Sequence, residues 1–142
     1  MQILFYAIDP TSAQHRIAAE WLEAAINDRE PLGLAWPTIH QFLRLGTHPA
    51  FPGCMSDDEA LGWVEEWLDV GAETISDSEM SWSLFAELLG ASRRALRNAI
   101  DDAHLAAIAI SRGATLFSFD TDFEPFVAHG LRWERLGAEA RR

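Results

Sequence analysis

The sequence predicts an α/β fold with a mainly parallel sheet, helices on both of its faces and a helical arm beside it. Short apolar stretches that suit buried strands alternate with helical patterns of roughly 10 to 16 residues, which is typical of parallel sheets. The chain has 142 residues and no repeat, low-complexity tract or linker. A single domain over residues 1–142 is therefore expected.

The first half of the chain predicts two helices separated by a strand. Thr11 and Ser12 are suitable caps for a helix with apolar residues at helical spacing. The stretch LGLAW at 32–36 suits a short buried strand, and Pro37 suits the first turn of the helix that follows. Residues 47–54, rich in Pro and Gly, form a predicted loop.

A pair of helices is predicted next, as the helical arm. Ser56 and Glu59 have the spacing of a capping box, in which each residue satisfies a free backbone N–H group at the start of a helix. Ser78 is a suitable start for the second helix, and Gly90 is a suitable end for it.

The remaining elements follow the same alternation. The stretch at 73–76 is a weak strand candidate, 100–113 predicts a helix that stops at its glycine, and 115–119 and 131–136 predict strands. Each helix between parallel strands returns the chain to the edge from which the next strand starts.

Acidic residues follow the strand TLFSF (115–119) and begin the helix before it. A helix from Asp102 covers about 16 Å, and five strand residues cover a similar distance in return. Asp102 and Asp120 are therefore expected at the same edge, with Asp122 close by. Ligands of open α/β sheets bind at this edge, and carboxylates held together there repel each other unless a cation neutralises them. The pattern predicts a site for a hard divalent cation, Mg²⁺ or Mn²⁺.

A structural interpretation of the same acids stays open. Asp is a common cap at a helix start and a common turn residue after a strand. Asp101 and Asp102 lie about 100° apart on a helix, so only one of them is expected to face the edge.

Charge limits the ways in which the chain can meet nucleic acid. It has 22 acidic and 11 basic residues, every base is Arg, and the net charge is −11. Such a surface repels phosphate, so binding to a polyanion requires cations or a basic partner.

Other candidate groups are weaker. The five histidines lack the paired spacing of a zinc site, and His104 is expected to have a structural role. Arg93, Arg94 and Arg97 suit either a solvated face or contact with phosphate or an acidic partner. Cys54 is the only cysteine, and no stretch resembles a signal peptide or a membrane span, so a cytoplasmic protein is expected.

Three segments carry a resemblance to the VapC toxins of the PIN-domain family. NAIDDAHLAAIAISRGATLFSFDTDF (98–123) resembles the carboxyl-terminal half of these proteins, where an Asp-Ala-His helix precedes a strand that ends in Asp-x-Asp-Phe. WPTIHQFLRLGTHP (36–49) is similar to the family's middle segment, and LFYAIDPTSAQHRIAAEWLE (4–23) to its first helix.

The resemblance implies a PIN-like three-layer α/β/α sandwich. It also implies an Mg²⁺- or Mn²⁺-dependent endoribonuclease that is held inactive by a VapB-like antitoxin and usually forms a homodimer. Asp102 and Asp120 would be metal-binding catalytic carboxylates, and Asp122 a supporting acid that orients water. RNA is the implied substrate.

The chain departs from the family pattern at two places. The family opens with a strand that ends in Asp-x-Asn; here Gln2 falls where the Asn would be and Met1 at the x, so the first acid is missing. Either a sequence shortened at its start or a naturally degenerate copy of the family would explain the missing acid. Gln41 stands where many relatives have Glu, so the resemblance places it in the catalytic site beside the three acids, where it attracts a cation less than Glu would.

Two functions from different classes therefore remain. One is a metal-dependent endoribonuclease, the toxin of a toxin–antitoxin pair. The other is a catalytically impaired PIN-like module that binds an antitoxin without cleaving RNA, which the missing first acid and Gln41 favour.

Overall fold

The structure, a computed structural model, describes residues 3–28, 31–77 and 80–137. The chain divides into two compact units, which are Met1–Ile75 and Ser76–Arg142. We call them the N-terminal and C-terminal units and describe each by itself; that they form one domain stays a prediction. None of the helices in the described part of the chain is long and apolar enough to cross a membrane.

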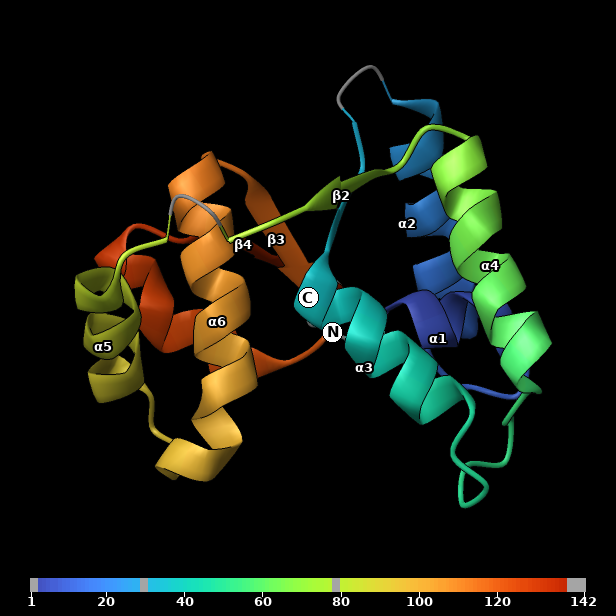
Figure 1. Cartoon of the computed structure of the whole chain (residues 1–142), viewed down its shortest axis with the longest axis horizontal. Helices are drawn as coiled ribbons and strands as arrows, with labels where there is room; N and C mark the ends of the chain where they lie inside the picture. The colour runs from blue at the N-terminus through green and yellow to red at the C-terminus, as the bar shows by residue number, and fades with distance from the viewer. Residues whose placement is uncertain (1–2, 29–30, 78–79, 138–142) are drawn as a thin grey trace. The chain divides into compact units, whose positions relative to one another are not determined.

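The N-terminal unit has four helices and two strands in its described part (Figure 1). In chain order they are α1 (Ile3–Ile8), α2 (His15–Asn27), β1 (Gly33–Ala35), α3 (Trp36–Gly46), α4 (Asp57–Asp69) and β2 (Glu73–Ile75). The two strands pair in parallel, with Leu34 opposite Thr74. The predictions of strands at 32–36 and 73–76 are therefore confirmed.

Local sequence explains where two of these helices begin. Pro37 lies in the first turn of α3, as predicted. Ser56 caps α4, and its Oγ accepts a hydrogen bond from the N–H of Glu59 at 3.2 Å. The predicted cap of α2 is wrong: this helix begins after Gln14, whose side chain makes no capping bond. The core of the unit is a cluster that includes Phe42 and Trp67, whose rings meet edge to face at 5.0 Å.

The C-terminal unit carries the acidic residues that the sequence singles out. Its described elements are α5 (Trp82–Ala91), α6 (Leu96–Arg112), β3 (Thr115–Ser118), the 3₁₀ helix η1 (Thr121–His129) and β4 (Arg132–Arg135). Strands β3 and β4 pair in parallel, with Leu116 opposite Trp133. Both strands were predicted, and η1 was not.

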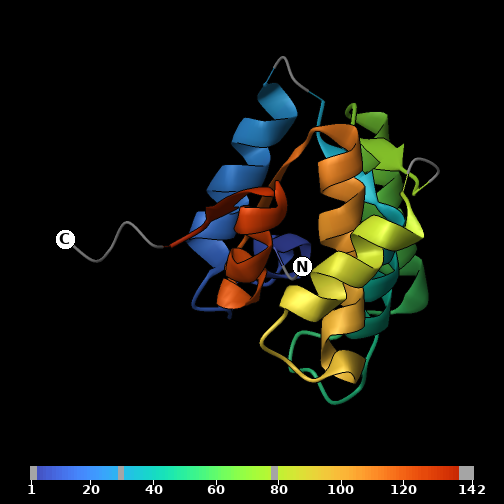
Figure 2. The same ribbon diagram turned by 90° about the vertical axis from the view of Figure 1, so that its left-hand side faces the viewer.

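Helix α6 is the central helix of this unit. It contacts α5, η1 and β3, and Figures 1 and 2 both show α5 alongside it. Ala103, Ala106 and Ala107 are completely buried, because small side chains allow close approach of neighbouring elements. Gly113 ends the helix in the left-handed conformation, with φ of 64°.

Two predicted helix boundaries need correction. Helix α6 begins at Leu96, four residues before the predicted start at 100, so Asp102 lies in its second turn rather than at its head. Helix α5 begins after Ser81, whose Oγ accepts a hydrogen bond from the N–H of Leu84, and it continues past Gly90 to Ala91. Ser78, the predicted start, lies outside the described residues.

Candidate metal centre

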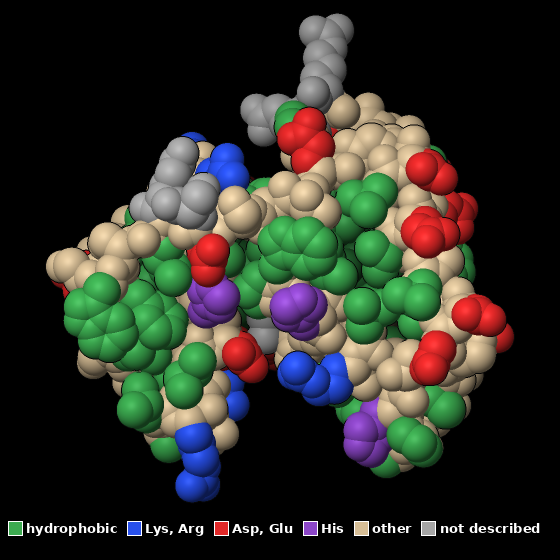
Figure 3. Space-filling view, viewed as in Figure 1, with side chains coloured by type: hydrophobic (Ala, Val, Ile, Leu, Met, Phe, Trp, Pro, Cys, Tyr) green, Lys and Arg blue, Asp and Glu red, His purple; other side chains and the backbone are tan. Residues whose placement is uncertain are grey.

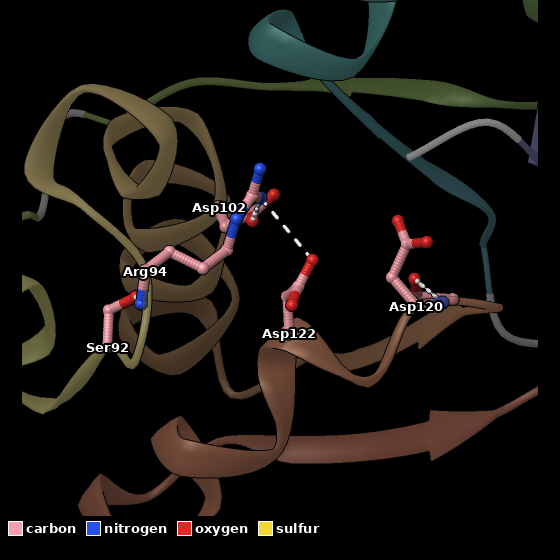
Figure 4. A network of polar contacts seen from close by, with 6 residues as sticks. Ser92, Arg94, Asp102, Asp120 and Asp122 are labelled. Atoms are coloured by element: carbon pink, nitrogen blue, oxygen red, sulfur yellow. Dashed lines mark hydrogen bonds and ion pairs between the residues drawn. The ribbon is translucent and has the colours of Figure 1, made fainter.

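Three aspartates lie around one end of β3, as Figure 4 shows. Asp102 projects from the second turn of α6, Asp120 precedes the first residue of η1, and Asp122 lies in the first turn of η1. The strand ends at Ser118, so both acids of the FDTDF stretch follow its carboxyl end. The expectation that Asp102 and Asp120 occur at the same edge agrees with this arrangement.

An arginine joins two of these carboxylates. Nη1 of Arg94 lies 2.8 Å from Oδ2 of Asp102 and 3.3 Å from Oδ2 of Asp122. Arg94 belongs to the short segment between α5 and α6, where its backbone N–H donates a hydrogen bond to Oγ of Ser92 at 3.1 Å. Asp102 and Asp122 therefore converge on one positive charge (Figure 4).

Asp102 and Asp122 differ in their exposure to water. The side chain of Asp102 is 10% exposed and that of Asp122 is 42% exposed. Burial raises the pKa of Asp102, the hydrogen bond and positive charge of Arg94 oppose this shift, and the negative charge of Asp122 adds to it. The guanidinium of Arg94 thus compensates a carboxylate that is costly to keep charged.

Asp120 is held by its backbone. Its N–H donates a hydrogen bond at 3.0 Å to Oγ of Ser118, which is completely buried. Its side chain is exposed, and Figure 4 shows its carboxylate apart from the Arg94 network. Within residues 3–28, 31–77 and 80–137, no group of three or more His, Cys, Asp or Glu side chains is arranged to hold a metal ion.

Gln41 belongs to α3 in the N-terminal unit. Its side chain is partly buried, and its Oε1 atom is buried without a hydrogen-bond partner in the described part of the chain. Its predicted role beside the three acids stays a prediction. Met1 and Gln2, where the family pattern is interrupted, lie outside the described residues.

Arg94 is the site residue that sequence reasoning missed. The arginines at 93, 94 and 97 were expected on a solvated face or against phosphate or an acidic partner, and the sequence did not indicate which of them would meet Asp102. Arg93 is exposed, with Nη1 4.0 Å from Glu124. Nothing in the sequence pattern distinguishes Arg93 from Arg94, because the path of the backbone between α5 and α6 decides which of them contacts Asp102.

His104 agrees with its expected structural role. Its Nε2 lies 3.1 Å from Oδ2 of Asp77, and its ring packs edge to face on Phe85. Both contacts hold the side chain within the C-terminal unit.

The side chains at this end of β3 fit a hard divalent cation in their chemistry. All three candidates are carboxylates, and Mg²⁺ and Mn²⁺ prefer oxygen ligands. The guanidinium between Asp102 and Asp122 occupies the place of a cation, which indicates that their geometry suits a positive charge. The carboxylates of Asp102 and Asp122 share the positive charge of Arg94, and the carboxylate of Asp120 does not.

Comparisons with known proteins give the chain's relatives. It is 31% identical over 135 residues to ribonuclease VapC37 of Mycobacterium tuberculosis, with 94% of this chain and 92% of the relative covered. It is 33% identical over 135 residues to ribonuclease VapC43 of the same species, with 94% and 90% covered. No protein-family model matches the chain.

A solved structure supports the fold. The crystal structure of VapBC2 from Rickettsia felis, bound to a DNA fragment from its promoter, matches with a TM-score of 0.65 at 16% identity, over 95% of this chain and 94% of that one. At 16% identity the match to this structure supports the fold alone. The relatives from M. tuberculosis, at 31% and 33% identity, show the family. The chain belongs to the VapC ribonuclease family and has its PIN-domain fold.

Proposed function

We propose that the chain is an Mg²⁺- or Mn²⁺-dependent endoribonuclease, the toxin of a VapBC-type toxin–antitoxin pair, which hydrolyses RNA phosphodiester bonds. One observation carries the proposal: Asp102 and Asp122 converge on a single positive charge at the carboxyl end of β3, with Asp120 at the same end. The names of the relatives, which are ribonucleases, support the same activity.

Each acid has a role that follows from its position. Asp102 is fixed on α6 and buried, so it would be the most rigid ligand of the cation. Asp120, exposed after β3, would be the second ligand. A divalent cation there would polarise a phosphoryl oxygen and lower the pKa of the attacking water. Asp122, half exposed, would orient that water for attack on phosphorus.

The proposal also accounts for an acidic protein that acts on RNA. With a net charge of −11, the chain as a whole repels phosphates. A bound divalent cation would provide positive charge next to the three acids, and Arg94 lies beside two of them. Substrate binding would then depend on the metal as strongly as catalysis does.

A VapB-like antitoxin is the proposed partner. Helix α5 presents Trp82 with 76% of its surface exposed, and Figure 3 shows hydrophobic side chains gathered over this helix. The matched structure of R. felis is itself a VapBC complex. Co-purification with the protein encoded beside this gene tests the partner, and light scattering of the isolated chain tests the proposed homodimer.

Cleavage of RNA by matched variants tests the nuclease proposal. Asp102→Asn keeps the shape of the side chain and removes its charge, and the expected loss of rate with Mn²⁺ is roughly 100-fold or more. Asp101→Asn is the control, because Asp101 is its exposed neighbour on the same helix, and its rate should stay within about twofold. Equal cleavage by the two variants would remove Asp102 from the mechanism.

The second candidate is the impaired module that binds an antitoxin without cutting RNA. The neutral Gln41 and the guanidinium that already neutralises Asp102 and Asp122 favour it. Calorimetry with Mn²⁺ separates the two functions, because tight binding of the metal would count against a module without catalysis.

A further inference from the structure

Arg94 contacts Asp102, which the proposed function makes a metal ligand, and Asp122, which it makes the acid that orients water. We infer that Arg94 is a resident counterion of Asp102 and Asp122, which a divalent metal must displace in order to bind. The inference rests on the proposed metal site, and it adds a residue that controls how tightly that site holds its ion. It assigns no direct contact with substrate to Arg94.

The two cations compete because both need the carboxylate of Asp102. A single nitrogen of Arg94 lies 2.8 Å from Oδ2 of Asp102 and 3.3 Å from Oδ2 of Asp122. Mg²⁺ would approach the carboxylate of Asp102 to about 2.0–2.1 Å. Its charge would repel a guanidinium that stayed in place, so Asp102 holds one cation or the other.

Arg94 is the partner that can leave. Its side chain is 39% exposed, and the segment between α5 and α6 that carries it is not helical. Its backbone is tied locally, by the bond to Oγ of Ser92. Asp102, in contrast, is buried within α6, so displacement moves the arginine and leaves the acid in place.

Occupation by Arg94 has a physical reason in the metal-free chain. A buried carboxylate without a partner is costly, and a charge-assisted hydrogen bond offsets that cost. A metal that binds must therefore replace an interaction that already stabilises Asp102. Part of the binding free energy is used for that exchange, and the observed affinity is lower than the acids alone would give.

Titration calorimetry with Mn²⁺ tests this in the full chain, with Arg94→Met and Arg93→Met as a matched pair. Both variants remove one positive charge from the same segment, but Nη1 of Arg93 lies 4.0 Å from Glu124 instead of contacting Asp102. Arg94→Met should bind Mn²⁺ about tenfold more tightly than the unsubstituted chain, the factor expected for loss of a competing charged hydrogen bond. Arg93→Met should stay within about twofold. Equal affinities for the two variants, or weaker binding by Arg94→Met, would overturn the inference.

The unsubstituted chain gives a second test that does not depend on how the variants fold. Mg²⁺ is diamagnetic, so the side-chain Nε–H signal of Arg94 can be followed by NMR during a titration. This signal should shift as Mg²⁺ saturates the site, while that of Arg93 shifts little. An Arg94 signal that stays unchanged at saturation would show that no displacement occurs.

These outcomes also separate the inference from the proposed function. Tighter Mn²⁺ binding by Arg94→Met together with no RNA cleavage would support the inference that Arg94 is a counterion and contradict the proposed nuclease activity. If the chain cleaves RNA and its Mn²⁺ affinity is the same with and without Arg94, the nuclease proposal is upheld and the counterion inference is contradicted. Failure of both the unsubstituted chain and Arg94→Met to bind Mn²⁺ would contradict both.

Discussion

Asp102 is a buried acidic residue, and the stability of the chain should depend on its charge. Burial raises the pKa of its carboxyl above the ordinary aspartate value, so the folded chain holds this proton more tightly than the unfolded chain does. The contribution to stability is complete below the unfolded pKa and is lost as the pH rises through the folded pKa.

Comparison with Asp102→Asn isolates this effect. The free energy of unfolding of the unsubstituted chain, relative to that of the variant, should fall as the pH rises from about 3 to about 7. Urea unfolding of both chains in the presence of EDTA measures this difference. A difference that grows with pH would mean that Asp102 is stabilised as a carboxylate, contrary to the effect of its burial.

Some of the site residues could be predicted from the sequence and others could not. Asp102, Asp120 and Asp122 could be selected because the sequence pattern placed each of them near a predicted boundary of alternating strands and helices, although Asp102 lies in the second turn of α6. Arg94 could not, because its contact with two of them depends on the path of a short segment rather than on residue spacing. The role of Gln41 rests on family resemblance alone.

At the scale of elements, capping signals predict some helix ends better than others. Ser56 was recognised because a capping serine three residues before a glutamate has a definite physical effect. The start of α6 was placed too late because its cap is Ala95, which has no side-chain acceptor and so leaves no signal. The 3₁₀ helix η1 was missed because Pro125 lies inside it and its apolar residues do not follow the α-helical period.

The end of α6 supports a prediction about Gly113. Its φ of 64° is unfavourable for a residue with a Cβ atom, whereas the nearest side-chain atom, Nη2 of Arg132, would lie at an ordinary contact distance of 3.5 Å. Gly113→Ala should therefore lower the free energy of unfolding by about 1 kcal/mol through backbone conformation alone.

Gly90→Ala is the matched control in the same unit. Gly90 lies in α5 and has open space around the position of a Cβ atom. Alanine is the better helix former, so this substitution should leave stability unchanged or raise it by up to about 1 kcal/mol. Chemical denaturation measures both variants, and a loss for Gly90→Ala as large as for Gly113→Ala would contradict the role of the left-handed conformation.

At the scale of the whole molecule, the sequence indicated the fold class for two independent reasons. Alternation of strands and helices predicted parallel pairing, and β1 with β2 and β3 with β4 both pair in parallel. Resemblance of three segments to VapC toxins predicted the family, which the relatives confirm. Composition could not locate the proposed cation site, because 22 acidic residues offer many places where a divalent ion could bind weakly.

Paramagnetic broadening by Mn²⁺ in NMR spectra of the ¹⁵N-labelled chain tests the central claim most directly, since it reports where the ion binds. The amide signals of Asp102, Asp120 and Asp122 should broaden at the lowest Mn²⁺ concentrations. The acidic first turn of α4, which contains Asp57, Asp58 and Glu59, is an internal control for non-specific binding and should broaden later. Broadening that begins in that turn, or that affects all acidic segments equally, would contradict a specific metal site at the end of β3.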